Sequence, residues 1–270
     1  FLPGVAQSGN SCVAALVTGD PGRVRPLAEF HGIPQVVSYA EYDALLAGDP
    51  VDVDAVYIAL PNSMHADYAI RAARAGKHVL VEKPLSRTEA EARAMIAAAE
   101  AAGRVLAGGF NMRYYPAFHH VKDVVLSGDL GEIDHVRVYG GHSGLSNFSH
   151  EWQYRTPASG GGTMWDVGIH MSDMARHILG DITKVYGVVS ERVWKLPGSE
   201  DNAMAILHGP DGVNAIYQAA WTDWTGYSTD FTGLATGDVE AVELPCDGHP
   251  WSAEVAIAPW SALIFSQDRG

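Results

Sequence analysis

Four polar side chains recur at helical spacing in the segment after Gly160-Gly-Gly162: Asp166, His170, Asp173 and His177. At about 100° per residue, positions i, i+4, i+7 and i+11 lie on one stripe of a helix. A histidine with a nearby carboxylate is suited to move a proton near neutral pH. Taken alone, such a stripe is more typical of packed or solvated polar residues. An adjoining apolar stripe is expected to pack against the core and consists of Val167, Met171, Met174 and Ile178.

A second candidate is Glu82-Lys83-Pro84, which directly follows the apolar run His78–Val81. A lysine there would project from the carboxyl edge of a sheet, and Pro84 would stiffen the turn behind it. Its ammonium could hold a substrate hydroxyl and stabilise negative charge that develops on oxygen. By itself, a solvated loop lysine explains Lys83 equally well.

The elements that carry these segments must bring them together. Up to about residue 110, short apolar runs alternate with helical patterns, which indicates strands joined by helices in a parallel, doubly wound α/β sheet. The expected strands are Cys12–Thr18, Asp54–Leu60, His78–Val81 and Val105–Phe110. The expected helices are Arg23–His31, Tyr39–Leu46, Ser63–Ala75 and Thr88–Ala102. Such sheets bind ligands at the carboxyl ends of their strands, here the loops at 18–20, 60–65 and 82–84.

After about Tyr115 the pattern changes to long alternating runs. They predict an α+β domain with a large, mainly antiparallel sheet, a hairpin at Gly209-Pro-Asp-Gly212, and helices at Pro116–Ser127 and near 163–179. The expected strands are Glu132–Gly141, Lys184–Trp194, Asn202–His208, Val213–Thr222 and Val239–Leu244. We therefore expect two domains, 1–115 and 116–270; Gly248–Gly270 fits no clear element.

Composition excludes several classes of protein. The net charge is −14, from 32 acidic and 18 basic side chains, which argues against nucleic acid as a partner because phosphate binding needs a basic face. No segment approaches about 18 consecutive apolar residues, so no membrane span is expected. Two cysteines, Cys12 and Cys246, are too few for a disulfide scaffold or a thiolate metal site and fit a reducing cytoplasm. Cys12 is expected to be a small buried apolar residue.

A metal hydrolase is one alternative function. His170, Asp173 and His177 have a spacing that could ligate a metal, with His142 or His150 as further ligands. No pattern of supporting residues accompanies them, and we expect no metal.

Two longer segments carry a resemblance. Asp54-Ala-Val-Tyr-Ile-Ala-Leu-Pro-Asn-Ser-Met-His65 with Ala75-Gly-Lys-His-Val-Leu-Val-Glu-Lys-Pro84, and then Gly160-Gly-Gly…Asp166-Val-Gly-Ile-His170, resemble the two signatures of the glucose–fructose oxidoreductase/inositol dehydrogenase family (Gfo/Idh/MocA). The resemblance extends from about residue 5 to 245. It implies a Rossmann-like dinucleotide-binding domain followed by a substrate and oligomerisation domain. The implied enzyme is an NAD(P)-dependent oxidoreductase that transfers hydride between a nicotinamide and a sugar, cyclitol or related polyol.

The resemblance also implies roles for single residues. Lys83 would contact the substrate hydroxyl and the nicotinamide region, His170 would take the hydroxyl proton as general base, and Asp166 would orient substrate and imidazole. The positions expected to border the cofactor are Thr18, Gly19, Asp20, Arg23, Leu60, Pro61, Asn62, His65, Glu82 and Lys83. The positions expected to border the substrate are Arg113, Tyr114, Trp152, Tyr154 and Arg155.

The loop Thr18-Gly19-Asp20, with Arg23 beyond it, bears on the choice of cofactor. An acidic side chain there usually holds the adenosine ribose hydroxyls, whereas small hydroxylated residues with a nearby arginine accommodate a 2′-phosphate. The loop resembles the phosphate-tolerant variant, with Thr18 and Arg23 reaching the phosphate. NADP is therefore favoured, and Asp20 keeps NAD open.

One part of the family pattern has no counterpart. The family opens with a strand and a Gly-x-Gly-x-x-Gly turn whose amides hold the pyrophosphate, whereas this sequence starts inside the helix expected to follow them, either through omitted residues or as a truncated relative. A non-catalytic dinucleotide-binding sensor or assembly subunit is therefore the alternative to the enzyme. A homo-oligomer, a dimer or tetramer, is implied because the family's exposed sheet commonly pairs between subunits.

Overall fold

A computed structural model of the chain describes residues 1–142, 144 and 151–221. These residues belong to the first of two compact units, Phe1–Thr222 and Asp223–Gly270. The strand expected at Val239–Leu244, Cys246, His150 and the stretch 248–270 lie outside the described residues.

The strands described in the first half pair only in parallel, as the sequence predicts. β1 pairs with β2, and β3, β4 and β5 form a second sheet in that order. Their bounds are β1 Ala15–Thr18, β2 Gln35–Ser38, β3 Ala55–Ile58, β4 His78–Val81 and β5 Leu106–Gly108. The strand Gln35–Ser38 was not expected, because two valines between polar neighbours give too short an apolar run to be recognised.

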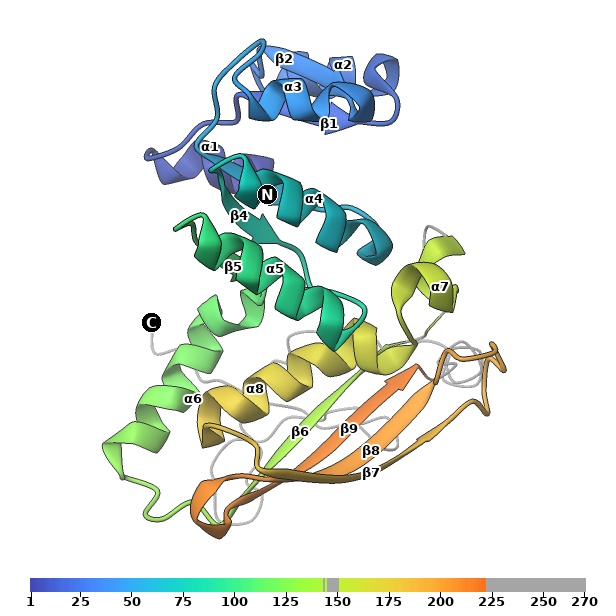
Figure 1. The fold of residues 1–270 in the computed structure, drawn as a ribbon. Coiled ribbons are helices and arrows are strands. Elements are labelled where there is room, and N and C mark those ends of the chain that lie inside the picture. The colour runs from blue at the N-terminus through green and yellow to red at the C-terminus, as the bar shows by residue number, and fades with distance from the viewer. Residues whose placement is uncertain (143, 145–150, 222–270) are drawn as a thin grey trace, which may run out of the picture. The chain divides into compact units, whose positions relative to one another are not determined.

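Helices alternate with these strands (Figure 1). Their bounds are α1 Leu2–Ser8, α2 Pro21–Phe30, α3 Tyr42–Leu46, α4 Asn62–Arg74 and α5 Glu89–Ala101. The helix expected at Tyr39–Leu46 begins with a 3-10 turn, Tyr39–Glu41, because Ser38 and Glu41 form a capping box. α5 begins where expected, since the Thr88 side chain accepts a hydrogen bond from the amide of Glu91.

One apolar core joins β3 and β4 to α4 and α5, which lie side by side (Figure 1). Its buried members include Tyr42, Ile58, Ala72, Val81 and Met95. The core fixes the carboxyl ends of β3 and β4, so the loops that follow them start from rigid positions. Cys12, expected to be buried, is instead exposed, because β1 begins only at Ala15 and Cys12 lies in the segment before it.

The second half contains a four-stranded sheet in the order β6-β9-β8-β7. The β7–β8 and β8–β9 pairs are antiparallel and the β6–β9 pair is parallel, which confirms a mainly antiparallel sheet. The strand bounds are β6 His135–His142, β7 Lys184–Ser190, β8 Asn202–His208 and β9 Asn214–Trp221. The helices are α6 Pro116–Ser127, α7 Thr156–Ser159 and α8 Ile169–Leu179, with 3-10 turns at Asn111–Tyr114, Glu151–Tyr154 and Pro210–Gly212.

α8 packs on this sheet (Figure 1). Of the predicted apolar stripe, Val167 and Met171 belong to the shared core, and Ala175 and Leu179 complete it in place of Met174 and Ile178. Met171 and Ala175 are buried against Val138 and Tyr217. Gly140 on β6 lets the helix approach, because a Cβ there would lie 2.9 Å from Val167 and 3.0 Å from Met171. The buried face of α8 therefore fixes how its polar side chains are directed.

The motif helix is not a continuous α-helix. Residues Met164–Gly168 form a π-turn, and α8 begins after it. Gly168 lies against Tyr217, so that a Cβ there would come 2.1 Å from the tyrosine oxygen. A π-turn widens the backbone and often occurs at functional sites. It changes the direction of Asp166 relative to the regular stripe expected for residues 166 to 177.

Within the described part of the chain, none of the helices has both the length and the apolar character needed to cross a membrane.

Candidate active site

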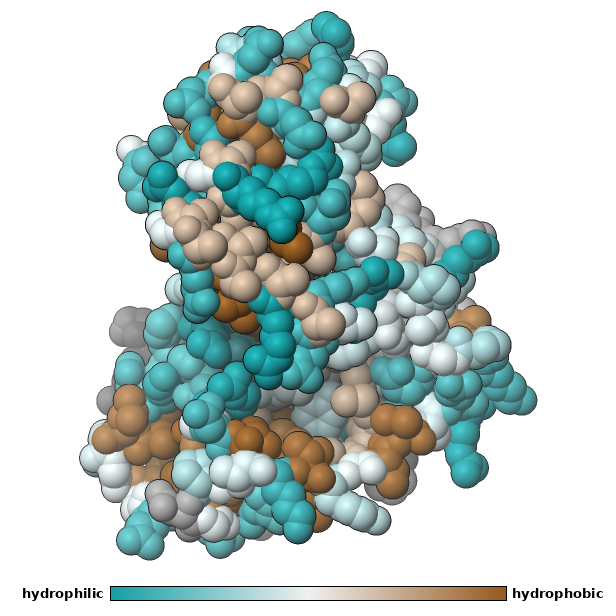
Figure 2. All heavy atoms as spheres, viewed as in Figure 1, coloured by the Kyte–Doolittle hydropathy of each residue, from teal (hydrophilic) through white to brown (hydrophobic). Residues whose placement is uncertain are grey.

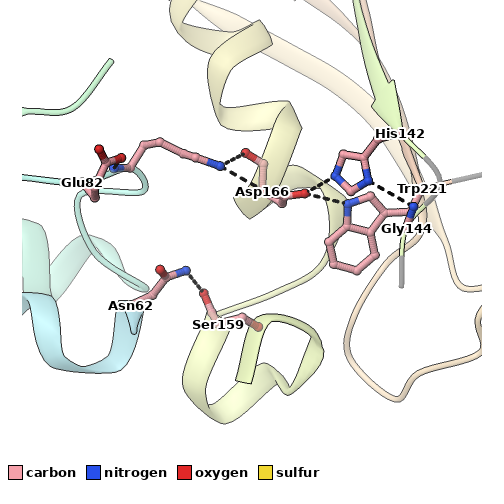
Figure 3. A network of polar contacts seen from close by, with 8 residues as sticks. Asn62, Glu82, His142, Gly144, Ser159, Asp166 and Trp221 are labelled. Atoms are coloured by element: carbon pink, nitrogen blue, oxygen red, sulfur yellow. Dashed lines mark hydrogen bonds and ion pairs between the residues drawn. The ribbon is translucent and has the colours of Figure 1, made fainter. Parts of the chain in front are cut away.

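The two sequence signatures meet in space at Lys83 and Asp166 (Figure 3). Lys83 Nζ donates to the backbone oxygen of Asp166 at 3.0 Å and to its Oδ1 at 3.1 Å. Lys83 follows β4, and Asp166 lies in the π-turn before α8. The contact joins the end of a parallel strand to the motif helix, as expected for side chains that share a site.

The second oxygen of Asp166 is held from the four-stranded sheet (Figure 3). His142 Nε2 donates to Asp166 Oδ2 at 2.5 Å, and Trp221 Nε1 donates to the same atom at 3.0 Å. The amide of Gly144 donates to His142 Nδ1 at 3.0 Å. His142 was considered only as a metal ligand and Trp221 not at all, because no local motif marks two strand ends that meet only in the folded sheet.

These contacts determine the charge on Asp166. Burial alone would raise its pKa, but the hydrogen bond from His142 and the positive charge of Lys83 outweigh burial and lower the pKa to about 2. Asp166 is therefore a carboxylate at neutral pH.

His170 lies in the first turn of α8 and is buried, with 8% of its surface exposed. Burial lowers its pKa and the charge of Lys83 lowers it further, against the opposing charges of Asp166, Asp173 and Glu82. Its Nδ1 is buried and has no hydrogen-bond partner among the described residues. The ring is therefore neutral at physiological pH and able to accept a proton.

A cavity of about 240 Å³ lies beside Lys83 and Asp166. Several residues of the sequence prediction line it: Leu60, Asn62, Glu82, Lys83, Trp152 and Asp166. Small-molecule pockets usually have volumes of about 300–1,000 Å³, so this cavity matches one end of a dinucleotide or a sugar ring rather than a complete cofactor.

Glu82 lies at the lining of this cavity and is held from both sides. Tyr57 donates its hydroxyl to Glu82 Oε1 at 2.6 Å, and the amide of Lys83 donates to Oε2 at 3.1 Å. The Tyr57 hydroxyl stays protonated and able to donate, because burial and the Glu82 carboxylate raise the pKa of that phenol. A fixed carboxylate at this point fits the ribose hydroxyls of a dinucleotide.

His65 and Pro61 do not line the cavity. His65 is fully buried and its ring nitrogens lie 2.9 Å from the Pro84 oxygen and 2.8 Å from the Leu60 oxygen. Through these contacts His65 ties together the loops after β3 and β4. Asn62 lines the cavity but also donates its side-chain amide to the Ser159 oxygen at 2.8 Å (Figure 3).

The expected cofactor loop after β1 is formed by its own short-range hydrogen bonds. The amide of Asp20 donates to Thr18 Oγ1 at 3.2 Å, and Asp20 Oδ1 accepts from the amide of Arg23 at 3.1 Å. Asp20 is the N-cap of α2, with Gly19 before it. Asp20 and Arg23 are exposed, so both side chains are accessible to a ligand at this edge.

The expected substrate residues separate into groups. Arg113 and Tyr114 line a second cavity of about 340 Å³, where Arg113 donates to both carboxylate oxygens of Asp173 at 2.8 and 2.5 Å. Trp152 lines the cavity beside Lys83. Tyr154 and Arg155 directly precede α7, where their backbone oxygens accept hydrogen bonds from Ser199 and from the amide of Ser159 respectively.

Glu200 is a positioning residue that no sequence pattern reveals. Its Oε2 accepts from the amide of Gly162 at 3.0 Å and its Oε1 from the amide of Met164 at 2.9 Å. A Cβ on Gly162 would lie 2.0 Å from the Glu200 backbone oxygen, so glycine is required there. A carboxylate at the start of a helical segment satisfies its free amides and fixes where Asp166 begins to project.

The polar stripe beyond His170 has structural contacts. Asp173 binds Arg113, and His177 Nδ1 lies 3.4 Å from Lys122 Nζ. Among the described residues, no group of three or more His, Cys, Asp or Glu side chains has a geometry that could hold a metal ion.

Comparison with known proteins identifies the family. Residues 2–110 match the family model described as "Oxidoreductase family, NAD-binding Rossmann fold". Residues 118–239 match the one described as "GFO/IDH/MocA C-terminal domain". The chain belongs to the GFO/IDH/MocA family.

Several of the relatives are named as enzymes that act on sugars. The 1,5-anhydro-D-fructose reductase of Ensifer adhaerens is 32% identical over 82% of this chain and 66% of its own length. An aldose-aldose oxidoreductase of Caulobacter crescentus, solved with glycerol, shows 31% identity and a TM-score of 0.76 over 96% of this chain and 80% of its own. A levoglucosan dehydrogenase solved with NADH and levoglucosan shows 29% identity and a TM-score of 0.68 over 77% of this chain and 58% of its own. This chain spans 50–66% of the length of the first curated relatives.

Proposed function

We propose that this protein is an oxidoreductase that transfers hydride between NADP or NAD and a hydroxyl-bearing carbon of a sugar, cyclitol or related polyol. The observation that carries the proposal is the contact of Lys83 with Asp166 beside the cavity of about 240 Å³. The names of the relatives, which include sugar reductases and dehydrogenases, support the substrate class.

Lys83 steadies the reacting oxygen. An ammonium carries three N–H donors, and two of those on Lys83 point to the backbone oxygen and Oδ1 of Asp166. The third is directed to a substrate oxygen, where it stabilises the charge that develops as the hydroxyl proton leaves. Asp166, ionised because its pKa is lowered to about 2, keeps the ammonium in place.

His170 is the general base for alcohol oxidation. A neutral imidazole accepts the hydroxyl proton, and the lowered pKa of His170 keeps it neutral. In the reverse direction the same ring returns the proton.

The bound nicotinamide supplies or accepts the hydride. The residues present fit its ribose end, because Glu82 is fixed beside the cavity by Tyr57 and by the amide of Lys83. We favour NADP, with Thr18 and Arg23 on the 2′-phosphate; with NAD, Asp20 would hold the ribose hydroxyls instead. Arg113, Tyr114, Trp152, Tyr154 and Arg155 remain the proposed substrate contacts.

A second copy of the chain is the proposed partner. The face of the four-stranded sheet opposite α8 carries exposed apolar side chains in register: Tyr139, Tyr186, Val188, Met204, Ile206 and Ile216. Further apolar residues gather in the lower part of Figure 2, over α6 and the near side of the four-stranded sheet as Figure 1 draws them. Apolar side chains that gather on one exposed face often mark an interaction site. Light scattering tests this proposal: a strict monomer at micromolar concentration would contradict it.

We also propose that the protein is located in the cytoplasm, where Cys12 would stay reduced.

The test of activity is a screen of sugars and cyclitols with NAD and with NADP, following absorbance of the reduced nicotinamide. Turnover of a polyol supports the enzyme. Dinucleotide binding by fluorescence without turnover of any substrate would support the non-catalytic relative instead, and absence of binding would exclude both.

A further inference from the structure

The carboxylate of Asp166 is held from two directions by different parts of the fold. Its Oδ1 accepts from Lys83, and its Oδ2 accepts from His142 and Trp221 (Figure 3). The proposed reaction assigns a role to the first contact only. The pair of donors on Oδ2 has no assigned role.

His142 and Trp221 form one structural unit. They are the last residues of β6 and β9, and they are Cα partners in the parallel register of these strands. Trp221 is fully buried, and its ring lies 6.2 Å from that of His142. Two adjacent strands therefore end in two N–H donors aimed at one oxygen, and a buried indole provides a rigid support.

The position of the proton on His142 follows from its neighbours. Because the amide of Gly144 donates to Nδ1 at 3.0 Å, Nδ1 carries no proton. Nε2 is then the nitrogen that carries the ring proton, and it donates to Asp166 at 2.5 Å. The backbone of Gly144 thus selects the tautomer that Asp166 requires, an arrangement by which a second hydrogen bond sets the donor nitrogen of a histidine.

The geometry has a consequence for Lys83. A carboxylate free to rotate about its Cβ–Cγ bond could turn Oδ1 away from the ammonium. With Oδ2 fixed by two donors, rotation would break hydrogen bonds to a charged group, which are among the stronger ones in proteins. The four-stranded sheet β6-β9-β8-β7 therefore fixes the Asp166 carboxylate, and through it the position of the Lys83 ammonium.

We propose that His142 is a positioning residue for the hydride-transfer reaction, acting through Asp166 on Lys83 with Trp221 as the second donor. This inference rests on the proposed function. His142 does not need to touch substrate or cofactor; it keeps the Lys83 ammonium at the cavity in the orientation that meets the reacting oxygen.

The experiment compares His142→Leu, His142→Gln and Trp221→Phe with the wild-type protein and with His135→Leu, a control at the exposed start of the same strand. Glutamine can place an amide N–H near the position of Nε2, whereas leucine removes the donor. We expect kcat of His142→Leu to fall about 10- to 100-fold, the loss of one hydrogen bond to a charged group. The KM for the dinucleotide should be unchanged. His142→Gln should recover most of kcat, Trp221→Phe should lose less than His142→Leu, and His135→Leu should equal the wild type.

Wild-type kcat in His142→Leu, or equal losses in His142→Leu and His142→Gln when both melt at the wild-type temperature, would overturn the positioning role. The Asp166 carboxyl, titrated by carbon NMR in each protein, gives a second readout that does not depend on activity. Its midpoint should rise in His142→Leu and stay low in His142→Gln, and an unchanged midpoint in both overturns the inference. If the wild type turns over no polyol, the proposed function fails, and this titration alone decides whether His142 holds Asp166.

Discussion

Lys83 Nζ lies 3.1 Å from Asp166 Oδ1, although 83 positions separate the two residues in the sequence. Each has one-quarter of its side chain exposed, at 25%, so the ion pair is shielded enough to be directional and open enough to meet a ligand. The pair connects the loop after β4 with the π-turn before α8.

Replacing Lys83 by methionine tests the donor role of the ammonium. The change keeps the unbranched apolar part of the side chain and removes all three donors, so we expect kcat to fall about 10²–10³-fold, the usual cost of removing a donor to a developing oxyanion. Dinucleotide affinity, measured by fluorescence titration, should change little. Lys77→Met is the matched control because Lys77 pairs with exposed Asp52 away from the cavity. Equal activity of Lys83→Met and the control would contradict the role.

His170→Ala should lower the rate of alcohol oxidation by about 10²–10⁴-fold, the usual contribution of a general base. In the wild type, kcat/KM should fall as the pH decreases through the pKa of His170 in the free enzyme, because only the neutral ring accepts a proton. The lowered pKa places this acid limb below the ordinary histidine value of about 6.5. The pH profile of kcat/KM measures the limb, which should vanish in His170→Ala. If the acid limb has its midpoint above that value, or persists in His170→Ala, a residue other than His170 is the general base.

Arg23→Ala addresses the choice between NADP and NAD. Arg23 is exposed in the first turn of α2, and losing its contact with a 2′-phosphate should raise the KM for NADP about 10- to 100-fold. The KM for NAD should stay within about twofold, since NAD lacks that phosphate. Arg25→Ala, two positions further along the same helix and also exposed, is the control. Parallel changes for both cofactors would show that Arg23 does not read the phosphate.

His65→Leu is expected to destabilise the fold rather than to remove a ligand contact. The substitution leaves the Leu60 and Pro84 oxygens without the ring nitrogens that lie 2.8 and 2.9 Å from them. An unsatisfied buried acceptor costs about 1–3 kcal/mol, so the free energy of unfolding should fall by more than it does in His120→Leu, a change at an exposed site on α6. Denaturant unfolding followed by circular dichroism gives both values. A loss of dinucleotide affinity at unchanged stability would instead return His65 to the cofactor site.

Local sequence was sufficient to predict most elements. The strand His78–Val81 and the helix Pro116–Ser127 have the expected bounds, and Thr88, the first residue of the helix expected over 88–102, is the N-cap of α5. These elements depend on apolar periodicity and capping, which are properties of neighbouring residues. The short strand Gln35–Ser38 was missed because its pairing with β1, rather than its own residues, makes it a strand.

For the site, the sequence by itself determined that Lys83, Asp166 and His170 belong to two signatures whose elements could meet, since residue type and spacing are local properties. Only the tertiary structure decided which residues hold them. Glu200 binds the start of the motif helix from a distant loop, and His142 and Trp221 reach Asp166 because β6 and β9 pair in register. Strand pairing and the π-turn at Met164–Gly168 depend on contacts between distant parts of the chain. Local patterns in a single sequence give no information about such long-range contacts.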